Sequence, residues 1–148
     1  MITIVDLKAE LGKLAMLHGR RPETTEAERK ASGAFATLTP FRDGNIFSAK
    51  FAGEGAWERH PNGDELVQIV DGSTNFHLMT DDGLQSFALG AGTMVIVPQG
   101  TWHRFVSPDG VTVMTATPKP TEHLTVGVDD PRTLSAEQLS GSIEEKWR

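Results

Sequence analysis

Two glutamates and two histidines stand at intervals that could bring them together in a folded chain. Glu58, His60 and Glu65 lie in one short stretch, and His103 follows closely behind the turn Pro98-Gln99-Gly100. Carboxylate oxygens and imidazole nitrogens are common metal ligands. The chain has no cysteine, so a metal would have to be held by nitrogen and oxygen. The spacing predicts one site if a small β-barrel aims these side chains at a common point.

The first three residues face one interior if they lie on neighbouring strands. Residues two apart on a strand project from the same face, so Glu58 and His60 point together while Trp57 and Arg59 point the other way. Four turn residues then reverse the chain, and Glu65 opens the next strand. This places Glu65 close enough to share a centre with the first pair.

His103 must reach that centre from a separate hairpin. It shares a strand face with Phe105, while Trp102 and Arg104 lie on the opposite face. We therefore expect Arg59 and Arg104 to form surface pairs rather than to reach a ligand inside the barrel. The large aromatic residues could line an apolar pocket, but strands need aromatic core residues in any case. Packing in the core or at an interface is expected for Phe41, Phe47, Phe51, Trp57 and Trp102.

Between residues 33 and 117 short β-type runs alternate with turn residues, a pattern typical of an all-β sandwich or barrel. Turns are marked by Asp71-Gly72 and by Pro108-Asp109-Gly110, among others. Strands are expected near 33–38, 45–51, 55–60, 65–71, 74–79, 84–88, 93–97, 102–107 and 111–116. Many short antiparallel strands in one domain favour a double-sheet jelly roll or a small closed barrel.

Helices are expected on both sides of this region. Asp6 can cap an N-terminal helix that ends near Gly19, with His18 in its last turn as a structural cap. Its apolar residues recur at intervals of three and four: Ile4, Leu7, Leu11 and Leu14. Thr25 and Glu28 fit a capping box for one further helical turn.

The other end of the chain carries a similar helix signal. Pro118-Lys119-Pro120 is expected to end the strand region, and Ser135 with Gln138 predicts a C-terminal helix. The chain is thus divided into an N-terminal helical extension (1–32), a β-domain (33–117) and a C-terminal tail (118–148). His123, in the proline-flanked tail, is expected to be solvated, and His77 to be a partly exposed strand residue.

Composition narrows the class of protein. A chain of 148 residues is long enough for one ordinary core, and 38% hydrophobic with 23% charged residues is typical of a soluble globular domain. The net charge of −6 offers no basic surface for nucleic acid. Charged residues interrupt the first 17 positions, so neither a signal peptide nor a membrane-spanning helix is predicted, and a cytoplasmic location is expected.

In two stretches the chain resembles the cupin family. The first cupin motif is matched by Glu58-Arg59-His60, four residues, Glu65, six residues and Gly72. The second is matched by Gly92, five residues, Pro98-Gln99-Gly100, two residues and His103. The resemblance covers about residues 53–107 and implies a jelly-roll (double-stranded β-helix) barrel with helical segments at both ends.

Three positions depart from the cupin pattern. Glu58 replaces the first histidine of the family, Ser107 stands where asparagine is usual, and Gly53 precedes Glu58 by one residue fewer. A different register would pair His60 with Asn62, but only two residues would then precede Glu65. The first register is therefore preferred.

The resemblance implies one divalent metal ion inside the barrel, held by His60, Glu65 and His103. Glu58 would be a fourth ligand or a general base. Two imidazoles with one carboxylate suit Fe(II) or Zn(II), and a second carboxylate favours harder ions, so iron, manganese, zinc and nickel are the candidates. The family further implies a small-molecule ligand, a homodimer, and a small metalloenzyme of the dioxygenase or isomerase type.

Two other interpretations of the same residues stay open. The first is a binding or sensing module without turnover. The second is a metal-free acid–base pocket, in which His60 and Glu65 form an ion pair and His103 is a satisfied interior histidine. In that pocket Glu58 and Glu65 would repel each other, and one of them would have a raised pKa.

Overall fold

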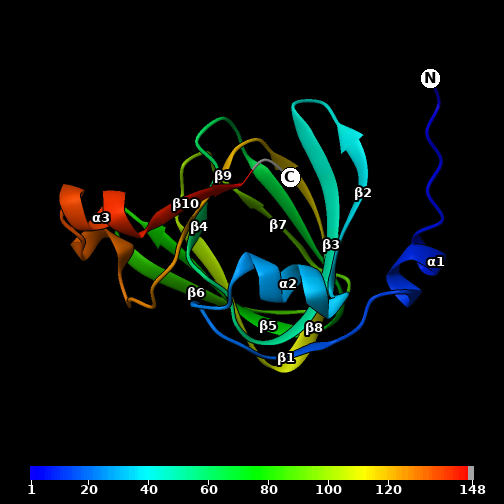
Figure 1. The fold of residues 1–148 in the computed structure, drawn as a ribbon, viewed down its shortest axis with the longest axis horizontal. Helices are drawn as coiled ribbons and strands as arrows, with labels where there is room; N and C mark the ends of the chain where they lie inside the picture. The colour runs from blue at the N-terminus through cyan, green and yellow to red at the C-terminus, as the bar shows by residue number, and fades with distance from the viewer. Residues whose placement is uncertain (147–148) are drawn as a thin grey trace.

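A computed structural model describes residues 1–146, and its strands form one strongly curled sheet (Figure 1). The helices are α1 (Leu7–Gly12), α2 (Glu26–Ser32) and α3 (Ala136–Ser142). The strands are β1 (Leu17–Arg20), β2 (Phe35–Phe41), β3 (Gly44–Glu54), β4 (Glu58–Arg59), β5 (Glu65–Thr80), β6 (Gly83–Gly90), β7 (Met94–Val97), β8 (His103–Pro118), β9 (Thr121–Leu124) and β10 (Ile143–Lys146). The predicted jelly-roll architecture is confirmed.

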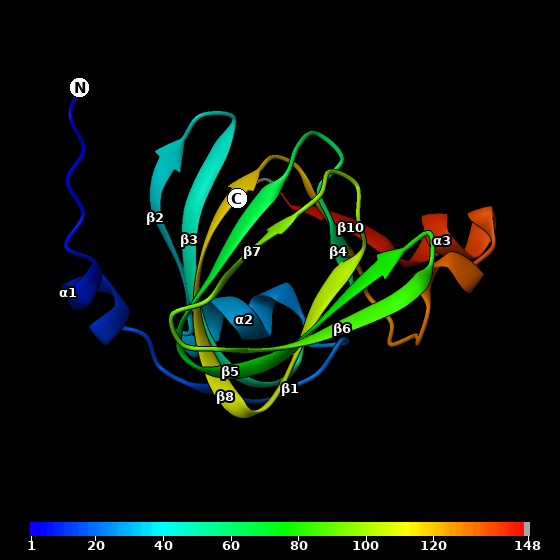
Figure 2. The same ribbon diagram turned by 180° about the vertical axis from the view of Figure 1, so that it is seen from behind.

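The long strands β5 and β8 form the spine of the barrel. They pair antiparallel with each other; β8 also pairs with β3, and β5 also pairs with β6 and β7. β1 runs parallel to β3, and β2 completes a hairpin with it. Seen from both sides, α2 lies within the outline of the curled sheet (Figures 1 and 2).

Four of the predicted strands combine in pairs into two long strands. The segments expected at 65–71 and 74–79 form β5, and those at 102–107 and 111–116 form β8. The turn residues between them bend the strands without reversing them, because Gly72 and Gly110 meet side by side at a register shift. Gly72 has φ +72°, and a Cβ there would collide with the carbonyl of Gly110. Glycine at this position permits both strands to curl around the interior.

The core divides between the inside of the barrel and its outer face. The interior cluster includes Phe51, Ile69 and Phe76, all essentially inaccessible to solvent. A second cluster on the other face contains Trp57, Met79, Trp102 and Leu124, and the C-terminal segment packs against it. Burial is thus confirmed for Phe51, Trp57 and Trp102. Phe41 is not part of the core: it is 50% exposed at the end of the β2–β3 hairpin, and its packing at an interface stays a prediction.

At the N-terminus the capping signals are better predictors than the apolar spacing. The side chain of Asp6 accepts a hydrogen bond from the backbone of Ala9, but α1 is short and buries no residue. His18 is not a helix cap, because it lies in β1. The capping box of Thr25 and Glu28 is confirmed at the start of α2.

The tail is more structured than predicted. The capping box of Ser135 and Gln138 is confirmed in α3, but Pro118-Lys119-Pro120 does not end the sheet, because β9 and β10 follow. β9 lies beside β4, with His123 opposite Glu58, so His123 is buried rather than solvated. The last two residues of the predicted tail lie outside the described residues. Within residues 1–146 no helix has the length and apolar character needed to cross a bilayer.

Candidate metal centre in the barrel

All four predicted site residues stand at the start or just past the end of strands at one end of the barrel. Glu58 opens β4, Glu65 opens β5, and His103 opens β8, directly opposite Glu58. His60 follows β4, and its carbonyl accepts a hydrogen bond from the backbone of Gly100 at 3.0 Å. This bond ties the loop after β4 to the loop before β8. Candidate ligands from three strands are thereby brought to one end of the barrel.

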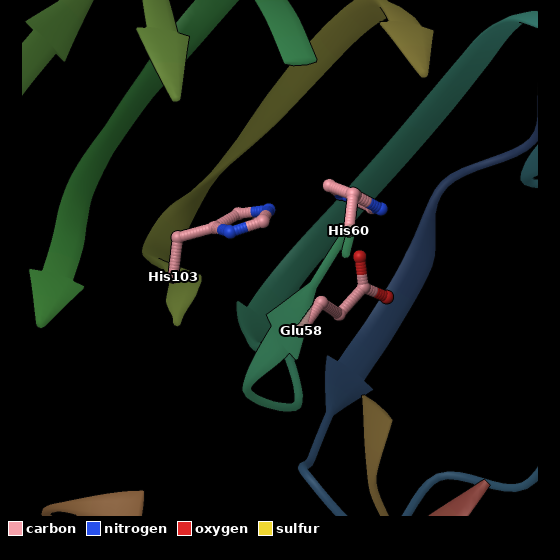
Figure 3. A group of neighbouring side chains, drawn as sticks. All are labelled: Glu58, His60 and His103. Atoms are coloured by element: carbon pink, nitrogen blue, oxygen red, sulfur yellow. The ribbon is translucent and has the colours of Figure 1, made fainter. Parts of the chain in front are cut away.

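The side chains of Glu58, His60 and His103 turn toward a common space (Figure 3). One donor atom from each of the three lies within 4.8 Å of the other two. Glu65 joins the group through the imidazoles, since its two oxygens lie 3.2 Å from Nε2 of His60 and 3.1 Å from Nε2 of His103. The histidines and Glu65 are at most 5% exposed, whereas Glu58 is partly exposed.

Each buried side chain has a further polar contact. Nδ1 of His103 lies 2.9 Å from the carbonyl oxygen of Thr101. A carbonyl can only accept, so Nδ1 carries the proton, and in the neutral form of the ring Nε2 directs its lone pair into the site. Nδ1 of His60 lies 3.1 Å from the hydroxyl of Thr121, and Glu65 accepts a 2.6 Å hydrogen bond from Thr117. These contacts fix the three side chains before any ligand arrives.

The two Nε2 atoms lie close to Glu65 without forming hydrogen bonds to it. Both are buried, and neither has a hydrogen-bond partner within the described residues. Buried polar atoms are normally satisfied, so two unsatisfied nitrogens side by side call for a partner. Two ligands at about 2.1 Å from one metal and at right angles lie about 3 Å apart. The contacts of His60 and His103 with Glu65 have this length, and the donor set therefore fits a divalent ion.

The family comparison covers these residues. Residues 48–116 match the family model described as "Cupin domain", and all four site residues lie within that range. The chain contains a cupin domain. In this domain Glu58 takes the place of the first motif histidine and still points into the barrel, so the substitution changes the donor without moving it out of the site.

Three of the solved structures to which the cupin barrel is similar illustrate the low sequence identity. Hydroquinone 1,2-dioxygenase from Sphingomonas sp. is 19% identical over 57% of this chain and 64% of its own, with a TM-score of 0.49. A cupin-2 domain containing protein from Shewanella frigidimarina is 22% identical over 66% and 96% of the two chains (TM-score 0.49). KdgF from Halomonas sp. is 20% identical over 57% and 79% (TM-score 0.48).

These similarities concern the fold. The matched part spans less than two thirds of the dioxygenase chain. No curated protein matches the sequence significantly. The chemistry of the cupin site must therefore be argued from its own residues.

Electrostatics within the site favour an ionised Glu65. Burial raises the pKa of its carboxyl, but the charge of His60 and the short contacts with both imidazoles outweigh burial and lower the pKa to about 2. Burial lowers the pKa of His103, but the contact with Glu65 and the charges of Glu65 and Glu58 raise it above the ordinary value. The expected repulsion between the glutamates therefore does not raise the pKa of Glu65, because imidazoles lie against its oxygens.

A cavity of about 150 Å³ adjoins the site. Glu58, His60 and Glu65 form part of its wall, and Phe47, predicted as a packing residue, lines it as well. Two residues in the wall were missed by sequence reasoning, Arg20 and Arg29, because they come from the charged N-terminal extension and belong to no motif. Thr121, which contacts His60, also lines the cavity and was missed because it lies in the tail beyond the matched motifs.

The outer face of the cupin barrel carries the residues expected there. Arg59 forms a 2.7 Å salt bridge with Glu122. Arg104 stacks over Trp57 at 4.8 Å and approaches Nδ1 of His77 at 3.4 Å. Burial lowers the pKa of His77, Arg104 adds to this, and Glu54 opposes it. His77 thus belongs to the outer face and supplies a matched control histidine for the site.

Proposed function

We propose that the barrel binds one divalent metal ion through His60, Glu65 and His103, and that the protein is a small metalloenzyme acting on a small molecule in the adjoining cavity. The observation that supports this most directly is the pair of buried Nε2 atoms without hydrogen-bond partners, both within 3.2 Å of Glu65. Glu58, partly exposed and on the cavity wall, is a fourth ligand or a base.

The residues around the site would have separate tasks in such an enzyme. A bound ion would supply Lewis-acid chemistry, or redox chemistry if it is iron. Thr101 and Thr121 would keep the imidazoles oriented, and Thr117 would hold Glu65. Glu58 faces the cavity and would accept a proton from a bound molecule through its carboxylate.

One observation favours a second candidate, a metal-free acid–base pocket. Glu65 contacts both imidazoles, and the pKa of Glu65 is lowered to about 2 while that of His103 is raised. Such a pairing could hold and transfer a proton without an ion. A binding module without turnover would use the same cavity, and product formation distinguishes it from an enzyme.

Elemental analysis of untagged protein by inductively coupled plasma mass spectrometry tests the proposal. We expect close to one equivalent of iron, manganese, nickel or zinc per chain, either as purified or after reconstitution and desalting. A His77→Ala variant should bind the same amount, because His77 lies on the outer face. Absence of metal after reconstitution with all four ions would contradict the proposal and favour the acid–base pocket.

Glu58→Gln should weaken metal binding without abolishing it. The carboxamide keeps the size of the side chain but loses its charge, and Glu58 is the least buried of the four residues. We expect affinity to fall on the order of 10-fold, comparable with the loss of a residue that supports a ligand. Competition with a chromophoric chelator measures the change. Loss of all metal from Glu58→Gln would instead make Glu58 an indispensable ligand.

A further inference from the structure

Two arginines face the proposed metal site from outside the matched cupin residues. Arg20 ends β1 and Arg29 lies in α2, and both line the cavity that Glu58, His60 and Glu65 also line. Both arginines are buried, Arg20 to 8% exposure. Buried arginine is rare unless its charge serves a structural pair or a ligand.

The backbone of Arg20 is held close to the barrel. β1 runs parallel to β3 and places Arg20 opposite Gly53. Gly53 has φ +118°, and a Cβ there would collide with the backbone of Arg20. Glycine at this position therefore allows β1 to approach the sheet and to carry its arginine into the cavity wall.

The guanidinium of Arg20 lies over two aromatic rings in the cavity wall. Its carbon lies 4.3 Å from the ring centre of Phe51 and 5.2 Å from that of Phe35. Stacking occupies the face of the guanidinium, whereas its N–H groups lie around the edge. Among the side chains that the structure describes, these N–H groups have no hydrogen-bond or salt-bridge partner, although the charge of Glu58 is close enough to influence Arg20. The edge is thus open to an acceptor in the cavity.

Arg29 adds a second fixed charge to the same wall. Its Nη1 donates a 2.6 Å hydrogen bond to the carbonyl of Thr24, which anchors the side chain. Burial lowers the pKa of Arg20 to about 10; the charge of Glu58 opposes this and the charge of Arg29 adds to it. The two arginines therefore repel each other across a confined space.

A bound metal ion would add positive charge to the cavity wall. The wall contains Arg20 and Arg29 as well as Glu58 and Glu65, and a divalent ion on neutral histidines would add two further positive charges. Much of the remaining wall is apolar, with Phe35, Phe51 and Phe105 among its residues. Positive charge in such surroundings is costly, and an anionic ligand would offset it.

We propose that the cavity selects small organic acids: the edge of Arg20 binds a carboxylate, Arg29 adds positive potential, and the aromatic wall contacts an apolar body. The inference rests on the proposed metal site and specifies its ligand class. A guanidinium edge matches a carboxylate with two parallel N–H···O bonds. The cavity of about 150 Å³ has the size that accommodates a benzene-sized body.

Isothermal titration calorimetry of metal-loaded protein with benzoate and benzamide tests the ligand class. The two probes have nearly the same shape and differ in charge. We expect benzoate to bind at least about 10-fold more tightly, since a charge-assisted hydrogen bond is roughly twice as strong as a neutral one. Equal affinity for the two probes, or binding of neither, overturns the proposal. This comparison uses only the unaltered chain and does not depend on the folding of a variant.

Arg20→Met tests the residue assignment, with Arg104→Met as the matched control. Methionine keeps an apolar side chain over Phe51 but removes the donors. Arg104 also stacks on an aromatic ring, at 4.8 Å from Trp57, but on the outer face. Arg20→Met should lose about 10-fold or more in benzoate affinity and leave benzamide unaffected. Arg104→Met should retain the benzoate preference.

Metal content, measured on each sample, distinguishes failure of this inference from failure of the proposed function. A metal-loaded Arg20→Met that keeps the full benzoate preference overturns the role of Arg20 while the metal site stands. If the unaltered chain takes up no metal, the proposed function fails first. The charge argument fails with it, and the inference is overturned as well.

Discussion

His103→Ala is expected to lower the affinity for a divalent ion on the order of 100-fold or more, since one of three buried donors is removed from the site. Its Nε2 lies 3.1 Å from Glu65 and has no hydrogen-bond partner within the described residues. Its Nδ1 is anchored by the carbonyl of Thr101, so the ring is preset for coordination. Alanine removes the donor, and its chain neighbours Trp102 and Arg104 cannot replace it, since they point to the other face.

The measurement is metal retained after dialysis, followed by chelator competition, on untagged variants shown by circular dichroism to be folded. His77→Ala removes an imidazole from the outer face and serves as the control. His103→Gln, which keeps more of the buried volume, guards against loss of metal through a collapsed site. A folded His103→Ala that keeps one equivalent of tightly bound metal would rule out the site described here.

The convergence of the four candidate donor residues could be predicted from the sequence because it depends on local strand geometry and turn length. Strand alternation puts Glu58 and His60 on one face, a four-residue turn brings Glu65 beside them, and the motif spacing supplies His103. In the structure these residues do meet at one end of the barrel. The cupin match over residues 48–116 rests on the same stretch of chain. Local periodicity and turn length are properties that a sequence displays directly.

The positions of Arg20 and His123 depend on tertiary placement instead. Arg20 reaches the cavity because β1 lies parallel to β3, more than 30 residues later in the chain, and no pattern in a charged connector indicates this pairing. His123 is buried because β9 joins β4. Four-residue strands are too short to show a period, so the segment of β1 was predicted as the end of a helix and that of β9 as tail.

The turn signals at Asp71-Gly72 and Pro108-Asp109-Gly110 were interpreted too strongly. Glycine with φ above zero serves a reversal and a bend equally well, and sequence alone does not distinguish the two. In β5 and β8 the bends lie side by side. Because Gly72 has no side chain, its backbone can approach the carbonyl of Gly110 without a collision. The curl that they allow is what encloses the cavity.

Phe76→Ala is expected to destabilise the metal-free protein by about 3–5 kcal/mol, the usual cost of truncating a buried phenylalanine. Phe76 lies in β5, is 0% exposed, and packs edge-on against Phe105 with ring centres 5.0 Å apart. Its ring centre is also 5.8 Å from that of His103, so the cavity left by alanine would open directly beside a proposed ligand.

Urea denaturation of metal-stripped protein measures this loss, because bound metal would add its own binding energy to the folded state. Phe41→Ala is the control: Phe41 is 50% exposed and should change stability by no more than about 0.5 kcal/mol. Since domains of this kind are stable by only about 5–15 kcal/mol, Phe76→Ala should lower the urea midpoint markedly with an unchanged slope. A loss below about 1 kcal/mol would contradict the packing of Phe76 against His103 and Phe105, and with it the idea that the core of the barrel holds the ligand rings in place.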